Sequence, residues 1–157
     1  MSELKEGDMM PAFELPTDGG GTVSSESLKG KPYVLYLYPR DDTPGCTKEA
    51  QGFTEHKAAF AALGVPVVGL SKDDVASHDK FKTKYDLDLV LASDESGKLV
   101  EGLGAWVEKS NYGKTYMGID RSTFLVDGDG RIVRAWRKVK VPGHVEEVLD
   151  AARALGN

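Results

Sequence analysis

Residues 33–46 of the chain read YVLYLYPRDDTPGC, and this stretch decides the fold that the sequence predicts. Its first six residues, 33–38, are all apolar or aromatic, and a proline stands on either side of them. A short, continuously apolar run with such borders is typical of a strand buried on both faces of a sheet. Thr43 followed by Pro44 then predicts a helix start, with Thr43 as the N-cap and proline at the first helical position.

The pattern continues outward from this stretch as an α/β fold. Apolar residues at 50, 53, 60 and 63 keep to one helical face until Gly64, and residues 65–70 (VPVVGL) form a second apolar strand. This order of strand, helix and strand predicts a right-handed βαβ unit with parallel strands. The other expected elements are a hairpin or loose loop over residues 11–25, a helix from about Asp73, a strand over 87–91, a short helix over 99–103, a loop running to Met117, strands over 122–126 and 131–136, and a last helix from about Gly143. Together they predict one domain over residues 1–157, a mixed sheet with helices on both sides.

Two glycine-containing turns have alternative interpretations as ligand sites. The run Gly19-Gly20-Gly21 lacks the Gly-Lys-Ser/Thr that a phosphate loop needs, so a flexible turn is favoured. Residues 127–130 (DGDG) resemble the start of a calcium loop but lack its later ligands and its closing glutamate, so a plain hairpin turn is favoured.

Composition narrows the functional class. With 40% hydrophobic and 29% charged residues, the 157-residue chain has the make-up of an ordinary globular protein. Its net charge of −5 argues against binding along a nucleic-acid backbone. The first residues are charged and interrupted by Pro11, unlike a signal peptide, and no apolar run approaches the roughly 18 residues of a membrane span. We therefore expect a cytoplasmic protein with no nucleic-acid or membrane partner.

The single cysteine, Cys46, poses the main question. One cysteine forms no intramolecular disulfide and no multi-cysteine zinc site. We expect the histidines to be structural, because His78 falls on a predicted helix and His144 begins one. We expect no metal and no cofactor. At the third position of the predicted helix, unpaired backbone N–H groups and the helix dipole favour a thiolate over a neutral thiol. The alternatives are a small hydrophobe packed in the core, or a thioredoxin-type disulfide exchanger, whose second cysteine is replaced here by Glu49.

Four blocks of the chain resemble the peroxiredoxins. Residues 39–49 (PRDDTPGCTKE) resemble the peroxidatic motif Pro-x-x-x-Thr/Ser-x-x-Cys of that family. Residues 7–15 (GDMMPAFEL), 113–125 (GKTYMGIDRSTFL) and 139–149 (VKVPGHVEEVL) resemble its bacterioferritin comigratory protein branch, also called peroxiredoxin Q. The blocks are spread over nearly the whole chain in the family's order.

This resemblance implies a thioredoxin-like fold with an N-terminal β-hairpin extension. It also implies a thiol-dependent peroxidase, in which Cys46 attacks hydrogen peroxide or a small organic hydroperoxide and becomes a sulfenic acid. The sulfur is then expected to face a pocket that a hydroperoxide can enter.

The resemblance assigns roles to four further residues. The Thr43 hydroxyl would reach the peroxide and the thiolate, and Pro39 would shield the thiolate from water. Arg121 would stabilise the thiolate and the charge on the departing oxygen, although a surface ion pair is its alternative interpretation. Glu49 would hold Arg121 in place, with an exposed carboxylate on the helix surface as the alternative.

The chain departs from the branch at the resolving cysteine. Many members carry it five positions after the peroxidatic cysteine, where Gln51 stands here, and others carry it in the following helix, near Lys82. The resemblance therefore implies a one-cysteine enzyme resolved by an external thiol, such as thioredoxin, glutaredoxin with glutathione, or another small thiol. It also implies a monomer or a weak dimer. Rival hypotheses are a redox module that does not turn over and a binding protein with an inert cysteine.

Overall fold

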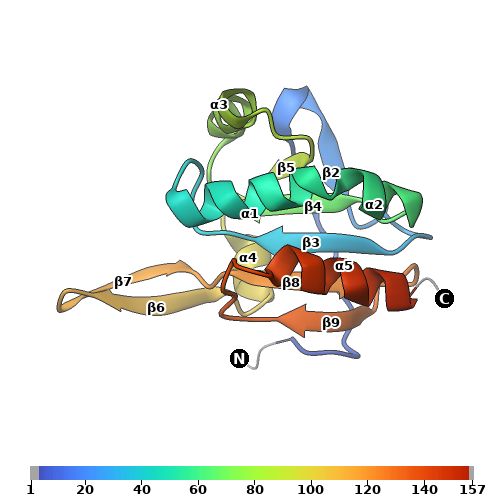
Figure 1. The fold of residues 1–157 in the computed structure, drawn as a ribbon. Helices are drawn as coiled ribbons and strands as arrows, with labels where there is room; N and C mark the ends of the chain where they lie inside the picture. The colour runs from blue at the N-terminus through green and yellow to red at the C-terminus, as the bar shows by residue number, and fades with distance from the viewer. Residues whose placement is uncertain (1–3, 156–157) are drawn as a thin grey trace.

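A five-stranded mixed sheet forms the centre of the computed structural model, which describes residues 4–155 (Figure 1). In spatial order its strands are β5 (Val90–Ser93), β4 (Val67–Ser71), β3 (Tyr33–Leu37), β8 (Ser122–Val126) and β9 (Ile132–Trp136). Strand β3 pairs in parallel with β4, as β4 does with β5, whereas β8 runs antiparallel to both β3 and β9. The predicted mixed sheet is confirmed, and so is the parallel pairing of the strands expected over residues 33–38 and 65–70, which are β3 and β4.

The central strand β3 owes its place to its apolar side chains. All five of its residues are buried, with Val34 and Tyr36 packed in the core on one face of the sheet and Leu35 and Leu37 in the core on the other. Alternating side chains of a strand point to opposite faces, so a strand covered on both sides has to be apolar throughout.

Helices lie on both faces of the sheet, as predicted. Helices α1 (Pro44–Glu55), α2 (Lys57–Ala62) and α5 (His144–Leu155) cover the face seen in Figure 1. The other face packs against α4 (Lys98–Gly102) and the N-terminal hairpin of β1 (Glu14–Pro16) and β2 (Thr22–Ser24), and that hairpin was also expected. Helix α3 (Val75–Tyr85) contacts β5 and the short 3-10 helix η1 (Asp18–Gly20).

Two expectations from the sequence were wrong in part. The helix expected after Thr43 is divided at His56, whose backbone (φ −98°, ψ 9°) lies outside the helical region. The apolar face continues across the break, with Phe53 and Phe60 both 1% exposed, which is why the periodicity predicted one helix. The strand expected over residues 87–91 begins only at Val90.

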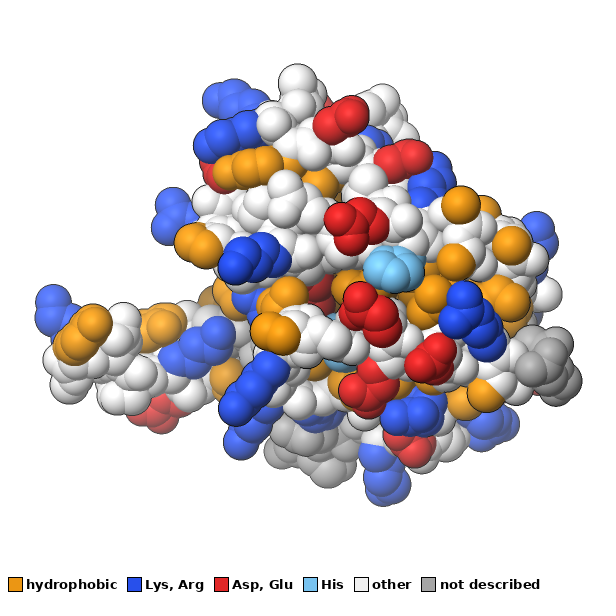
Figure 2. Space-filling model, viewed as in Figure 1, with side chains coloured by type: hydrophobic (Ala, Val, Ile, Leu, Met, Phe, Trp, Pro, Cys, Tyr) orange, Lys and Arg blue, Asp and Glu red, His pale blue; other side chains and the backbone are white. Residues whose placement is uncertain are grey.

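The loop expected to run to Met117 is instead a hairpin of β6 (Trp106–Asn111) and β7 (Lys114–Ile119). It turns at Tyr112 and Gly113, which both have positive φ (53° and 79°), as tight hairpin turns require. The hairpin projects from the body of the protein (Figures 1 and 2), and Tyr112 is 97% exposed. Its strands lack a buried apolar face, so the sequence carried little strand signal there.

None of the helices described within residues 4–155 combines the length and apolar character that a membrane crossing requires. Acidic and basic side chains are intermixed on the face that carries α1 and α5 (Figure 2).

Candidate active site

Cys46 lies in the first turn of α1, directly beyond the end of the central strand. Thr43 occupies the N-cap with an extended backbone (φ −101°, ψ 155°), and Pro44 opens the helix, as predicted. The third helical position belongs to the first turn, where backbone N–H groups have no carbonyl partner within a helix and the dipole has its positive end. This is the local environment that stabilises a thiolate.

A guanidinium group approaches the sulfur from the start of β8. Arg121 Nη2 lies 3.4 Å from Cys46 Sγ, and Nη1 donates a hydrogen bond of 2.7 Å to Glu49 Oε1. Arg121 is 75 residues from Cys46 in the sequence, and the antiparallel pairing of β8 with β3 brings its side chain to the start of α1. One arginine therefore bridges the only sulfhydryl group and a carboxylate.

Glu49 is completely buried, so the alternative of an exposed helix-surface carboxylate is wrong. The Arg121 side chain is 16% exposed, so its ion pair is not a surface one either. A signal for this burial was present in the sequence: Cys46, Glu49, Ala50 and Phe53 follow the i, i+3, i+4, i+7 spacing of one helical face, and all four are buried.

Burial sets the direction of the pKa shift of Glu49 but not that of Arg121. Desolvation raises the pKa of Glu49 to about 7, against the opposing charge of Arg121. For Arg121, desolvation acts to lower the pKa, but the charges of Glu49 and Cys46 outweigh it and the pKa is raised. Glu49 Oε2 has no hydrogen-bond partner among the described residues. The carboxyl group thus depends on Arg121 to be charged at neutral pH.

Thr43 and Pro39 lie in the loop that joins β3 to α1, and both are half-buried. The Thr43 hydroxyl donates to the Arg40 carbonyl at 2.9 Å and closes the turn, rather than reaching towards Cys46. Thr43 makes no side-chain capping bond either. The structure thus brings together Cys46, Arg121 and Glu49, while the expected contact of Thr43 with the sulfur is not made.

The sulfur is more enclosed than the sequence suggested, because Cys46 is only 1% exposed and packs within the core on the α1 side. A cavity of about 500 Å³ lies elsewhere, lined by Phe53, Phe60, Val67 and Val90, where β4 and β5 begin. Cys46 lies beyond the other end of the parallel strands. Cys46 is not among the residues that line this cavity. The cavity is therefore not an entrance to the sulfur, and it is not the open pocket that was expected there.

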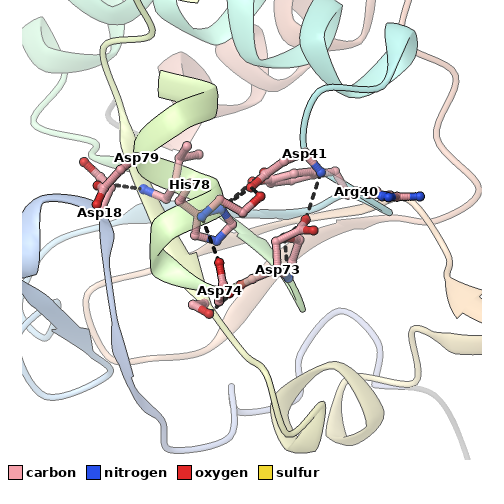
Figure 3. A network of polar contacts seen from close by, with 12 residues as sticks. Asp18, Arg40, Asp41, Asp73, Asp74, His78 and Asp79 are labelled. Atoms are coloured by element: carbon pink, nitrogen blue, oxygen red, sulfur yellow. Dashed lines mark hydrogen bonds and ion pairs between the residues drawn. The ribbon is translucent and has the colours of Figure 1, made fainter. Parts of the chain in front are cut away.

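A buried polar cluster beside the site was not predicted. His78 of α3 contacts Asp41, which belongs to the same loop as Thr43 (Figure 3). His78 was expected to be structural because it falls on a predicted helix, and it is fully buried. The 37 residues between the two partners left no signal in the sequence for the pair.

Comparisons with known proteins place this geometry in a family. The model of the AhpC/TSA family matches residues 7–135. The chain is 49% identical to the putative peroxiredoxin bcp of Coxiella burnetii, over 93% of this chain and 97% of that protein. It is 47% identical to peroxiredoxin Bcp of Bacillus subtilis, over 97% of both. A solved structure of the Xanthomonas campestris bacterioferritin comigratory protein, described for its alkyl peroxide reduction activity, superposes with a TM-score of 0.88 at 39% identity, over 92% of each chain.

Proposed function

The chain belongs to the AhpC/TSA family, among the Bcp and peroxiredoxin Q proteins, and from that premise we propose that it is a thiol peroxidase acting through Cys46. Its substrates are hydrogen peroxide and small organic hydroperoxides. The observation that carries this proposal is the Arg121 guanidinium, held by buried Glu49 with Nη2 3.4 Å from the Cys46 sulfur.

The reaction follows from the chemistry of a thiolate at that position. The Cys46 sulfur attacks one peroxide oxygen, an S–O bond forms and the O–O bond breaks. The sulfur is oxidised by two electrons to a sulfenic acid, and the second oxygen leaves as water or an alcohol after it gains a proton. Negative charge therefore moves from the sulfur to the departing oxygen.

Arg121 is suited to stabilise this negative charge both on the sulfur and on the departing oxygen. Its guanidinium carries donors in a fixed plane, so it stabilises the thiolate before attack and the leaving oxygen during attack. Glu49 fixes the orientation of that plane through Nη1. Because the ion pair is buried, its electrostatic effect is little screened by water.

Thr43 and Pro39 line the approach to the helix tip in this proposal. The Thr43 hydroxyl, now on the Arg40 carbonyl, would rotate to the bound peroxide, while the backbone N–H of Cys46 supplies a further donor. Since Cys46 is 1% exposed, the half-buried side chains at this loop have to give way slightly for a substrate to enter. That requirement favours small hydroperoxides.

An external thiol completes the cycle, because the 157 residues contain no second cysteine. A first thiol condenses with the sulfenic acid, releasing water and forming a mixed disulfide, and a second thiol frees Cys46. Thioredoxin, glutaredoxin with glutathione, or another small thiol fits this role, as does a cytoplasmic location where such thiols are kept reduced. We propose a single domain that acts as a monomer or weak dimer.

Steady-state turnover tests this function. The parent protein is mixed with excess hydrogen peroxide and each thiol reductant in turn. The moles of peroxide consumed per mole of enzyme are then measured. The proposal predicts many turnovers with at least one reductant and none in the Cys46→Ser variant. One oxidation equivalent per chain with every reductant would instead identify a redox module without turnover.

A further inference from the structure

A buried polar cluster connects α3 to the loop that precedes Cys46 (Figure 3). His78 is 0% exposed, and its Nδ1 lies 2.7 Å from Asp41 Oδ2. The same carboxylate accepts hydrogen bonds from the hydroxyls of Ser77 at 2.8 Å and Tyr38 at 2.6 Å. Asp41 therefore has three side-chain partners, two on α3 and one at the residue that follows β3, although it lies in a loop.

Both ring nitrogens of His78 face acceptors. Nε2 lies 2.9 Å from the Ala92 carbonyl oxygen on β5, which only accepts, and Nδ1 faces the Asp41 carboxylate. Asp73 adds a further negative charge nearby. Two acceptors favour an N–H on each ring nitrogen, which is the imidazolium form. Its pKa agrees in direction: desolvation acts to lower it, but the hydrogen bond and charge of Asp41 outweigh burial and raise it.

The loop is held at the next residue as well. Asp42 has a left-handed backbone (φ 61°), which is uncommon for a non-glycine residue. Its carboxylate accepts hydrogen bonds from Lys84 and Tyr85, again on α3. The backbone N–H of Asp41 donates to Asp73 Oδ2 at 2.8 Å. Helix α3 and the residues before it thus fix the path of the chain immediately ahead of Thr43.

From this arrangement we infer that His78 is a positioning residue for peroxide reduction: its bond to Asp41 sets the loop of residues 39–43, and so the placement of Thr43 and the first turn of α1 around Cys46. The inference rests on the proposed function. His78 acts only through Asp41 and touches neither the sulfur nor the substrate. Loss of the bond therefore affects peroxide attack, which needs the loop, more than the general reactivity of the sulfur.

Two substitutions at the same position separate this role from packing. The amide nitrogen of asparagine corresponds to Nδ1 of histidine, so His78→Asn keeps a donor for Asp41 and loses the one for Ala92. Glutamine corresponds to Nε2, so His78→Gln keeps the donor for Ala92 and loses the one for Asp41. Both variants remove the same charge.

The readouts are two second-order rates of Cys46, measured for the reduced full chain: oxidation by hydrogen peroxide and alkylation by iodoacetamide. A displaced substrate-binding loop costs about 10- to 100-fold in rate. We expect His78→Gln to lose that much in the oxidation rate with alkylation changed less than about threefold, and His78→Asn to retain most of the oxidation rate. Equal losses in both variants, a parallel fall in both rates, or an unchanged oxidation rate in His78→Gln would each overturn the inference.

A measurement on the parent protein serves if neither variant folds. The side-chain ¹⁵N chemical shifts of His78 at pH 7 are expected to be those of an imidazolium, with both nitrogens protonated. An Nδ1 without a proton, which has no hydrogen to donate to Asp41, would contradict the inference. The parent's own oxidation rate distinguishes the two proposals: a parent that peroxide does not oxidise refutes the peroxidase, whereas a rapidly oxidised parent with an unaffected His78→Gln variant refutes only the role of His78.

Discussion

Replacing Glu49 by glutamine tests the buried ion pair through the pH dependence of stability. Glutamine keeps the size of the side chain and an oxygen for Arg121 but removes the ionisable group. The pKa of Glu49 in the folded protein is about 7, against an ordinary value of 4.5. The carboxyl group therefore holds its proton more tightly in the folded state than in the unfolded one.

The sign and size follow from this difference. A group whose pKa is raised by folding stabilises the protein most below its unfolded pKa, and this contribution is lost as pH rises through the folded value. The shift corresponds to roughly 3 kcal/mol. We expect the free energy of unfolding of the parent, minus that of Glu49→Gln, to fall by about this amount between pH ~4.5 and pH ~8.

Urea denaturation of both proteins under reducing conditions, at closely spaced pH values, measures this difference. Titrating groups that do not contact Glu49 or Arg121, including His78, contribute alike to both proteins and cancel in the subtraction. A difference that stays constant across this range would refute the reasoning, because it would mean that Glu49 is already ionised well below neutral pH. The Arg121 charge would then balance or outweigh burial.

Other substitutions probe the site and the core. Arg121→Ala is expected to raise the barrier to Cys46 oxidation by about 2–4 kcal/mol with the circular dichroism spectrum unchanged, because the donor to the sulfur is lost; stopped-flow rates equal to those of the parent would remove Arg121 from the mechanism. Gly69→Ala is expected to cost about 1–3 kcal/mol in urea denaturation, since an added Cβ would lie 2.9 Å from the Tyr36 hydroxyl, and an unaltered midpoint would contradict that clash. Asp74→Ala removes the N-cap bond to Ser77 and is expected to lower the free energy of unfolding by about 1 kcal/mol. An unchanged free energy of unfolding would contradict that bond.

The sequence predicted best where a buried element gave a regular pattern. The run over residues 33–38 is continuously apolar because it forms the centre of the sheet, and Thr43-Pro44 opens a helix because proline lacks the N–H that a first turn leaves unused. The projecting hairpin of β6 and β7 was missed because its strands are largely exposed and carry no apolar alternation.

The residues of the candidate site also differ in how far the sequence predicted them. Cys46 and its place in the helix follow from local sequence, and the burial of Glu49 was readable from its spacing with Cys46. The approach of Arg121 depended on family resemblance, because 75 residues separate it from the sulfur. The bond between His78 and Asp41 had neither a local pattern nor a resemblance to indicate it, since it arises only when α3 packs beside the loop.

The central claim is that a helix tip and Arg121 hold the Cys46 sulfur ready to attack a peroxide. Stopped-flow mixing of the reduced protein with one equivalent of hydrogen peroxide, followed by the fluorescence of Trp106 and Trp136 and by mass spectrometry of the product, tests it directly. The account predicts oxidation at least about a hundredfold faster than free cysteine at the same pH, with one oxygen atom added at Cys46. A rate equal to that of free cysteine, or an unmodified Cys46, would contradict it.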